Sequence, residues 1–537
     1  MNLKKFIGFA TISLVFIIIA SGIILSVNMK SKVKELFILN RELQEEGYYM
    51  ADFEFRMLGF SYLLDKGRYY KALKSLSAYH GKLRTKEGLK RIPSFTDSQQ
   101  ETDFFLDLQD PVTGAFIDDS APFCIYIEIT RNIIGHLASL KNSDTVPLKL
   151  KYPLKFLDEI NTPEKLLPHL DDISYVGWLA SKFPQTTFHF SRNLLGETGS
   201  ENVLENNGVY QFSPEWKHAM LKWMYDFQDT ATGFWGPRNR KTHKLTKLDL
   251  NNTASILKSY RDNDGNDIYT EFPLKYKDKL FSSAIGQLSE PYPDHDDLPE
   301  IHEWNLRQGK GIKMLLRHLW KDASVTDRKD AEKIILRYID INFEKYYVRD
   351  EGAFSYYPDA GHASCDGNHD ILNGFGALSG TRQRELWGDP AENTRDLGAL
   401  VLNEIKSSDM EPVAAIPGIN SLRFYLGKPD FEHLCDSVWA VYYPGDTLVP
   451  DVMELVPNII RWTNTTTLSM GNWSSMAEIR KEFSKYNIEK PLVFKNELPR
   501  DEIKKKFEET TEIFVVGFDK LQIPRGMIKF KYTDRQL

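Results

Sequence analysis

Cysteine is scarce in this 537-residue sequence, which contains only Cys124, Cys365 and Cys435. An odd number of widely spaced cysteines is not the disulfide framework that stabilises small secreted domains. One disulfide with one free thiol, or three thiols, are both compatible with this number. Hydrophobic residues make up 42% of the chain and aromatic residues 12%, a composition that is ordinary for a globular interior.

Clusters of basic residues are also lacking. No run of five or more Lys and Arg residues occurs, and the formal net charge is −7 over the whole chain. A protein that binds nucleic acid needs a basic patch to neutralise phosphates. We therefore expect no nucleic-acid partner.

Long hydrophobic runs are absent except for residues 7–27, which contain no charged side chain and follow Lys4 and Lys5. A helix of that length crosses a hydrocarbon core of roughly 30 Å, whereas a cleaved signal peptide usually has a shorter apolar core. The two lysines favour a short cytoplasmic tail. The sequence thus predicts an uncleaved single-pass anchor within residues 1–29, in the cell membrane, with the bulk of the chain outside the cytoplasm.

A motif recurs along the chain at a nearly constant interval. Gln109–Phe116 and Gln228–Trp235 share the pattern Gln-Asp-x-x-Thr-Gly-x-aromatic, and Asp350–Phe354 is a shortened copy. The aspartates at 110, 229 and 350 are 119 and 121 residues apart. Asp and Gly favour tight turns, and helix-like segments flank each copy. A period of this length suits two helical hairpins, so three periods predict about six hairpins.

Repeated helical hairpins with a Gly-aromatic turn resemble the α/α-toroid proteins, a superfamily of terpenoid cyclases, protein prenyltransferase β subunits, and several polysaccharide lyases and glycosidases. The resemblance covers residues 60–480 and implies a mainly α fold, an α/α toroid of about six helical hairpins. Residues 30–59 are expected to form a juxtamembrane helix, and residues 481–537 a small α+β extension. A shared fold does not specify one reaction.

Two motifs of these families have partial counterparts here. The cyclase acid motif Asp-x-Asp-Asp is matched by residues 294–297, and the resemblance would make Asp296 the proton donor. The prenyltransferase zinc site would require Asp, Cys and His, the types found at Asp359, Cys365 and His369 with a different spacing. A terpenoid cyclase-like, isoprenoid-handling enzyme is therefore one alternative function.

Between the motifs, three segments carry further expectations. Residues 261–300 are rich in Asp, Pro and Gly and predict a long loop before a helix at 312–319. A helical pattern continues over residues 391–405, and strand-like pieces occur at 437–443, 513–516 and 527–532. The last two strands are expected to form a hairpin.

The densest group of reactive side chains follows the third motif. Between residues 356 and 370 lie Tyr356, Tyr357, Asp359, His362, Cys365, Asp366, Asn368, His369 and Asp370. So many polar groups cannot be buried without partners, so this stretch must line a wet surface or cleft. A loop on a rigid helical scaffold often carries function. The alternative is a solvated loop in which Asn368 or Asp370 caps the next helix.

The residue types in these loops fit β-elimination on a uronic-acid polymer. A base removes the proton next to the carboxylate, and a cation or amide stabilises the charge that develops. Tyr357 and His362 are the expected base and acid. Arg238, with Arg192 or Asn193, is expected to hold the carboxylate.

Glycoside hydrolysis is the second chemistry, and it requires two carboxyl groups that flank the scissile bond. Asp366 with Glu303, or Asp366 with Asp119, is the expected pair. Trp235 is expected to stack on a sugar, although a Trp after Gly at a turn also commonly packs into the core. Further substrate contacts are expected from Tyr356, His302, Asn368 and His369.

These observations predict an outward-facing, carbohydrate-active protein that performs lyase, hydrolase or epimerase chemistry on an acidic polysaccharide or glycolipid. The alternative from another class is a non-catalytic glycan-binding or scaffold protein of envelope or capsule assembly. No cofactor is predicted. A divalent metal is the remaining alternative, and His362, Asp366 and His369 are the residues that would hold it.

Overall fold

The computed structural model of the chain is mainly helical, which confirms this part of the expected fold class. It describes residues 32–532 apart from 34, 41, 44–45, 94, 96, 141–147, 179, 183–185, 201, 295–297, 349–352, 356, 362–370, 372–373, 375–382, 403–406, 432–439, 443–492, 495–511 and 522. The expected anchor at 7–27 lies outside these residues. Among the helices that are described, none combines the length and the apolar character needed to cross a bilayer.

The helices from α2 to α13 occupy the first two thirds of the chain. They are α2 (Phe53–Asp65), α3 (Tyr69–Thr85), α4 (Ser98–Leu106), α5 (Tyr126–Ser139), α6 (Pro163–Ser174), α7 (Phe188–Leu195), α8 (Val203–Asn206), α9 (Pro214–Asp226), α10 (Leu250–Leu257), α11 (Lys277–Leu288), α12 (Leu298–Met314) and α13 (Val325–Ile341). Short 3₁₀ turns are η1 (Phe123–Ile125), η2 (Lys155–Glu159), η3 (Ala180–Lys182), η4 (Gly196–Thr198) and η6 (Trp320–Asp322), and π-helical turns are η5 (Leu315–Leu319) and η7 (Asn342–Tyr346). The short helices α15 (Gln383–Trp387), α16 (Pro390–Asn393) and α17 (Ser407–Ala414) follow.

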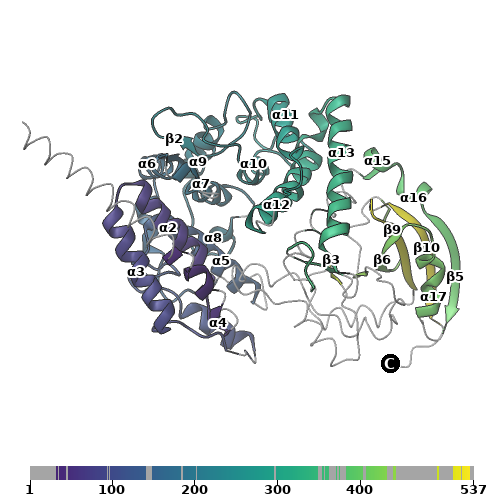
Figure 1. Cartoon of the computed structure of the whole chain (residues 1–537), viewed down its shortest axis with the longest axis horizontal. Helices are drawn as coiled ribbons and strands as arrows, with labels where there is room; N and C mark the ends of the chain where they lie inside the picture. The colour runs from purple at the N-terminus through teal and green to yellow at the C-terminus, as the bar shows by residue number, and fades with distance from the viewer. Residues whose placement is uncertain are drawn as a thin grey trace, which may run out of the picture.

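These helices pack in two rows. α5, α7, α10 and α12 contact one another in succession, while α6 contacts α9 and α11 contacts α13. The two rows touch where α6 meets α7 and where α11 meets α12. Figure 1 shows the helices as an arc that runs from α2 and α3 to α12 and α13. The chain therefore alternates between the rows as it advances along the arc.

The first two copies of the repeated motif fold into the same turn. Oδ1 of Asp110 accepts hydrogen bonds from the backbone N of Thr113 over 2.8 Å and from its hydroxyl over 2.9 Å. Oδ2 of Asp229 accepts the same two bonds from Thr232, at 3.0 and 2.9 Å. These local bonds are the reason that the two segments turn in the same way. The third copy begins at Asp350, outside the described residues.

The glycine of each turn is required by both conformation and space. Gly114 and Gly233 have φ angles of 76° and 77°, which L side chains rarely adopt. A Cβ atom at Gly114 would lie 1.9 Å from the carbonyl oxygen of Pro153, and one at Gly233 would lie 2.8 Å from the backbone N of Leu280. The turns therefore pack closely against the segments that follow α5 and α10.

The predicted loop over 261–300 is interrupted by helices, and this expectation was wrong. α11 occupies residues 277–288, and α12 begins at residue 298 rather than at 312. Tertiary contacts with α13 and α10 hold these segments, although their Pro and Gly content favours turns. The segment between residues 32 and 43 is helical where it is described, and its Leu36 and Leu43 are buried against Phe53 and Leu76. It therefore contributes to a hydrophobic cluster with α2 and α3.

A six-stranded sheet follows the helices, in the order β5-β10-β9-β6-β7-β8. Its strands are β5 (Arg395–Leu402), β6 (Ile419–Leu426), β7 (Ala440–Tyr442), β8 (Val493–Phe494), β9 (Glu512–Asp519) and β10 (Pro524–Tyr532). β5 and β10 are parallel, and the other neighbours are antiparallel. The β9–β10 pair confirms the expected hairpin. Two-residue pairs also form between β1 (Tyr175–Val176) and β2 (Arg238–Asn239), and between β3 (Tyr347–Val348) and β4 (Ala353–Phe354).

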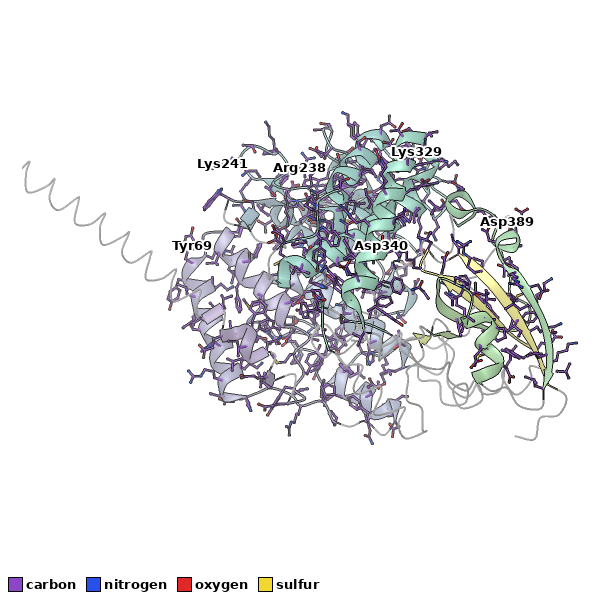
Figure 2. All side chains as sticks on the ribbon, turned by 45° about the vertical axis from the view of Figure 1, so that its right-hand side comes forward. Tyr69, Arg238, Lys241, Lys329, Asp340 and Asp389 are labelled. Atoms are coloured by element: carbon purple, nitrogen blue, oxygen red, sulfur yellow. The ribbon has the colours of Figure 1, made fainter. Side chains whose placement is uncertain are left out.

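The sheet begins earlier in the chain than expected. Residues 395–402 form β5 instead of the helix predicted over 391–405, because β10 satisfies their backbone groups from more than a hundred residues away. β5 and β6 share one sheet with residues 512–532, so this unit begins near residue 390 rather than at 481. Lys520, after β9, forms an ion pair with Asp340 on α13, which is labelled in Figure 2.

Candidate functional site

Two glutamates from distant parts of the chain interact in this fold. Burial raises the pKa of Glu54 on α2, and the negative charge of Glu303 on α12 raises it further. The residue Glu54 is exposed when all its atoms are counted, whereas the surrounding protein disfavours the charge of its carboxyl group. Glu54 therefore keeps its proton to a higher pH than an ordinary glutamate does.

Local structure positions both carboxyl groups. On α2, Phe53 and Phe55 are buried and Glu54 between them is exposed. On α12, the buried side chains of Trp304 and Gln308 donate hydrogen bonds towards α11, to the carbonyl oxygens of residues 290 and 288 over 3.2 and 3.0 Å. Because these two side chains anchor one face of α12, the helix turns Glu303 away from α11.

Glu303 is also held from α10. The carboxylate of Asp249 caps this helix by accepting a hydrogen bond from the backbone N of Asn252 over 3.0 Å. Two residues after the cap, Nδ2 of Asn251 donates to Oε1 of Glu303 over 2.7 Å. This hydrogen bond fixes the position of one carboxyl oxygen of Glu303.

An imidazole and a phenol lie beside this pair. The ring centroids of His302 and Tyr357 are 6.2 Å apart at an interplanar angle of 63°. Burial raises the pKa of Tyr357, and the charge of Glu54 raises it further. Tyr357 remains 41% exposed, so its hydroxyl is a proton donor within reach of a solute. The structure thus brings together Glu303, His302 and Tyr357, three of the residues that the sequence singled out.

Glu54 was missed by the sequence analysis. It lies in a segment that was expected to be a juxtamembrane helix, and no motif or spacing marks it. Its role depends on Glu303, which lies 249 positions further along the chain. Only the packing of α2 against the rest of the helices reveals the pair.

A pocket of about 210 Å³ lies between α10 and α12 and includes His302. Its wall is mostly helical, and the residues that line it are Ala254, Ser255, Lys258, His302, Asn305, Leu306, Gly309, Lys310, Lys313, Met314, His318, Tyr338, Ser355, Ile371 and Gly374. His302 is adjacent to Glu303 in sequence, whereas neither glutamate lines the pocket.

Arg192 and Asn193 belong to a second group of polar residues on α7. Nη2 of Arg192 lies 3.0 Å from Nε2 of His189, and Oε1 of Glu128 lies 4.0 Å from the same nitrogen. Burial holds the pKa of His189 well below its usual range, and the charges of Arg192 and Lys310 lower it further. Asn193 is only 3% exposed. This group is a largely buried network, in which His189 is neutral near pH 7.

Arg238 and Trp235 have structural roles in the turn after α9. The guanidinium of Arg238 donates to the carbonyl oxygens of Phe227 and His243, each over 2.9 Å. Trp235 is completely buried, and its Nε1 donates to the carbonyl oxygen of Met224 over 2.8 Å. No face of the Trp235 ring is open to a sugar, so the core-packing alternative describes this residue.

The described structure places none of the other residues predicted from the sequence at the carboxyl pair. Asp119 is exposed on the segment that leads into η1, next to the Asp118–Arg56 ion pair. Outside the described residues lie Tyr356, His362, Asp366, Asn368, His369 and Asp296. Their roles, including the metal set, stay predictions. Within the part of the chain that is described, no three His, Cys, Asp or Glu side chains are grouped to hold a metal ion.

No family model, no curated protein and no solved structure matches this chain. Its function is therefore inferred from the chemistry of the site.

Proposed function

We propose that this chain is a membrane-anchored, outward-facing glycoside hydrolase whose helices form an α/α toroid and which cleaves an acidic polysaccharide or glycolipid between Glu54 and Glu303. The toroid is supported by the alternation of helices between two rows. It is also supported by the electrostatic interaction of Glu54 with Glu303, because α2 and α12 are far apart along the arc yet these two carboxyl groups are near enough to influence each other.

The carboxyl pair is the observation that carries the proposed reaction. A glycosidase needs one carboxylic acid to protonate the leaving oxygen, and one carboxylate to act as base or nucleophile. Glu54, whose pKa is raised by burial and by Glu303, is suited to be the acid. Glu303, which accepts the hydrogen bond from Asn251, is suited to be the carboxylate. Because the environments of the two glutamates differ, Glu54 acts as the acid and Glu303 as the base or nucleophile.

The neighbouring rings support a second candidate, β-elimination. Tyr357 lies beside His302, and a phenol with a raised pKa can donate a proton to the leaving oxygen while an imidazole removes the proton next to the carboxylate. Both reactions place the glycan at the same site. They differ in their products, because only elimination leaves an unsaturated sugar.

The test is to incubate the full chain, in detergent, with acidic polysaccharides and to measure both new reducing ends and ultraviolet absorbance from an unsaturated product. We expect reducing ends without that absorbance. Glu54→Gln and Glu303→Gln should each lower the rate at least a hundredfold, which corresponds to about 2.7 kcal/mol of transition-state stabilisation. Glu271→Gln, at an exposed glutamate outside the site, is the matched control.

Three outcomes would decide against hydrolysis by this pair. An unsaturated product would select β-elimination. Glycan binding without any product, retained in both glutamine variants, would select the non-catalytic binding or scaffold protein. Reducing ends formed at the wild-type rate by both variants would place the reaction elsewhere.

A further inference from the structure

Two neighbouring tyrosines are exposed where α3 begins. Tyr69 is 57% exposed and Tyr70 is 80% exposed, and they are the first two residues of the helix. A tyrosine has an apolar ring and a polar hydroxyl group. Side chains of this kind are enriched at the level of the lipid headgroups, where one end of the ring is in an apolar medium and the other is hydrated.

Positive charge surrounds these tyrosines. Arg68, Lys71 and Lys74 are exposed, and the 17 residues of α3 include no Asp or Glu. In the part of the chain that the structure describes, none of these three cations forms an ion pair, and Asp65 at the end of α2 is already paired with Arg240. This end of α3 therefore attracts anions.

A second loop extends the same surface. The guanidinium of Arg240, after β2, donates hydrogen bonds to the carboxylate of Asp65 and to the carbonyl oxygen of Tyr175. The next residue, Lys241, is exposed. Figure 2 shows Lys241 and Tyr69 on the left-hand side of the helical arc. The residues that we call the Tyr–Lys surface are Arg68, Tyr69, Tyr70, Lys71, Lys74 and Lys241.

The helical segment that begins at Lys32 runs in the same direction as α3. Nζ of Lys32 donates to Oγ of Ser77 over 2.9 Å, and Oε2 of Glu35 lies 3.0 Å from Nε2 of His80. Because both partners advance by three residues, the two helices are parallel. Tyr70 precedes Ser77 by seven residues, which is about 10 Å along the helix axis. The N-terminal end of the segment therefore points towards the Tyr–Lys surface.

The predicted anchor is close to this end in the sequence. It comprises residues 7–27, so its last residue precedes Lys32 by five positions. Five residues span at most about 18 Å when they are fully extended. An anchor that crosses a bilayer would thus keep Lys32 near the headgroup layer, within reach of the Tyr–Lys surface.

We propose that the Tyr–Lys surface docks on the headgroup layer of a bilayer that contains anionic phospholipids. The tyrosine rings lie at the interface and the cations contact lipid phosphates, as basic segments next to a membrane do. An acidic glycan would match the charge as well, but the direction of the segment at Lys32 favours the membrane. This inference rests on the membrane anchor of the proposed function and not on its reaction. Docking fixes the orientation of the helical arc above the membrane, which a single anchor leaves free.

The test places a fluorescent ring on the surface. Tyr70→Trp is made in the full chain, which is reconstituted in phosphatidylcholine vesicles with and without phosphatidylglycerol, both brominated in their acyl chains. We expect bromine to quench the fluorescence that this variant adds to the wild type, and to quench it more in the anionic vesicles. Val325→Trp, at a residue 72% exposed at the start of α13, is the matched control and should not be quenched.

Lysine variants test the electrostatic part of the contact. Adding Lys71→Gln and Lys74→Gln to Tyr70→Trp should lower the ratio of quenched to unquenched fluorescence about tenfold or more in anionic vesicles, the effect expected for two lysines near an anionic surface. Lys329→Gln with Lys333→Gln, two exposed lysines of α13, should leave the ratio unchanged (Figure 2). If Tyr70→Trp does not fold, Tyr69→Trp provides the same reporter.

Four results would overturn the inference. They are an unquenched Tyr70→Trp, equal quenching of Val325→Trp, equal quenching in the two kinds of vesicle, and quenching that does not change in the lysine variant. A fluorescence change with a soluble uronic-acid polymer, without any change with vesicles, would assign the surface to the glycan instead.

Failure of this inference is distinguishable from failure of the proposed function. Glycan cleavage that depends on Glu54 and Glu303, without quenching of Tyr70→Trp, would remove only the docking. Quenching that depends on Lys71 and Lys74, without any cleavage of glycans, would remove only the hydrolase. A chain that does not float with neutral vesicles would remove the anchor, and flotation with anionic vesicles that depends on the lysines would still support the surface.

Discussion

Nδ2 of Asn251 on α10 donates a hydrogen bond to Oε1 of Glu303 on α12 over 2.7 Å, and so links two neighbouring helices at one carboxylate. A hydrogen bond to a charged group contributes about 1.5 to 3 kcal/mol. We expect Asn251→Ala to lower kcat roughly 10- to 100-fold and to change KM little, because it alters the carboxylate rather than the glycan contacts.

The control for this change is Asn206→Ala, which removes an exposed amide at the end of α8 that bonds to the carbonyl oxygen of Ser200. It should leave kcat unchanged. A kcat of Asn251→Ala that equals the wild-type value would show that this amide does not support the reacting carboxylate.

Glu54 should reduce stability at neutral pH. Its pKa in the folded state is raised, first by burial and then by Glu303, so the folded state binds its proton more tightly than the unfolded state does. This tighter proton binding stabilises the folded state fully at pH values below the unfolded-state pKa of about 4.3. The stabilisation is lost as the pH rises through the folded-state pKa. Glu54→Gln should therefore raise Tm relative to the wild type at pH 7 but not at pH 3.5, while it abolishes hydrolysis. Thermal unfolding at both pH values checks this, and a lower Tm at pH 7 would contradict it.

The glycines of the two matching turns should be irreplaceable. Gly114→Ala places a Cβ at a positive φ angle, which costs about 1 to 2 kcal/mol, and against the carbonyl of Pro153, where overpacking adds roughly 1 to 3 kcal/mol. Gly233→Ala should behave similarly. Gly286→Ala in α11 has open space around the new methyl group and should stabilise by about 0.5 to 1 kcal/mol. Denaturant unfolding of the three variants measures these differences, and equal stabilities would refute the argument.

Trp235 should affect stability and not substrate binding. Trp235→Phe removes the hydrogen bond to the carbonyl oxygen of Met224, which keeps its bond from the backbone N of Phe227, and leaves part of the buried indole site unfilled, at a cost of about 1 to 3 kcal/mol. We expect a lower midpoint of unfolding with an unchanged KM for the glycan. A raised KM without loss of stability would restore the sugar-stacking role.

The features that could be predicted from the sequence are those that depend on interactions between residues close together in the chain. The turns at Asp110 and Asp229 were recognisable because Asp, Thr and Gly act within a few residues of one another. The mainly helical fold and the β9–β10 hairpin were predictable for the same reason, since both depend on local periodicity. His302, Glu303 and Tyr357 were identified by residue type alone.

The sequence by itself determined the two turns, the helical character and a set of reactive side chains, because each of these depends on neighbours along the chain. Only the tertiary structure decided that residues 395–402 pair as a strand and that Trp235 is buried. It also decided that Glu54 and Glu303 interact electrostatically. These features require partners that lie tens to hundreds of residues away in the chain. Where packing brings such partners together, the free energy of their contacts outweighs the local conformational preference of the residues.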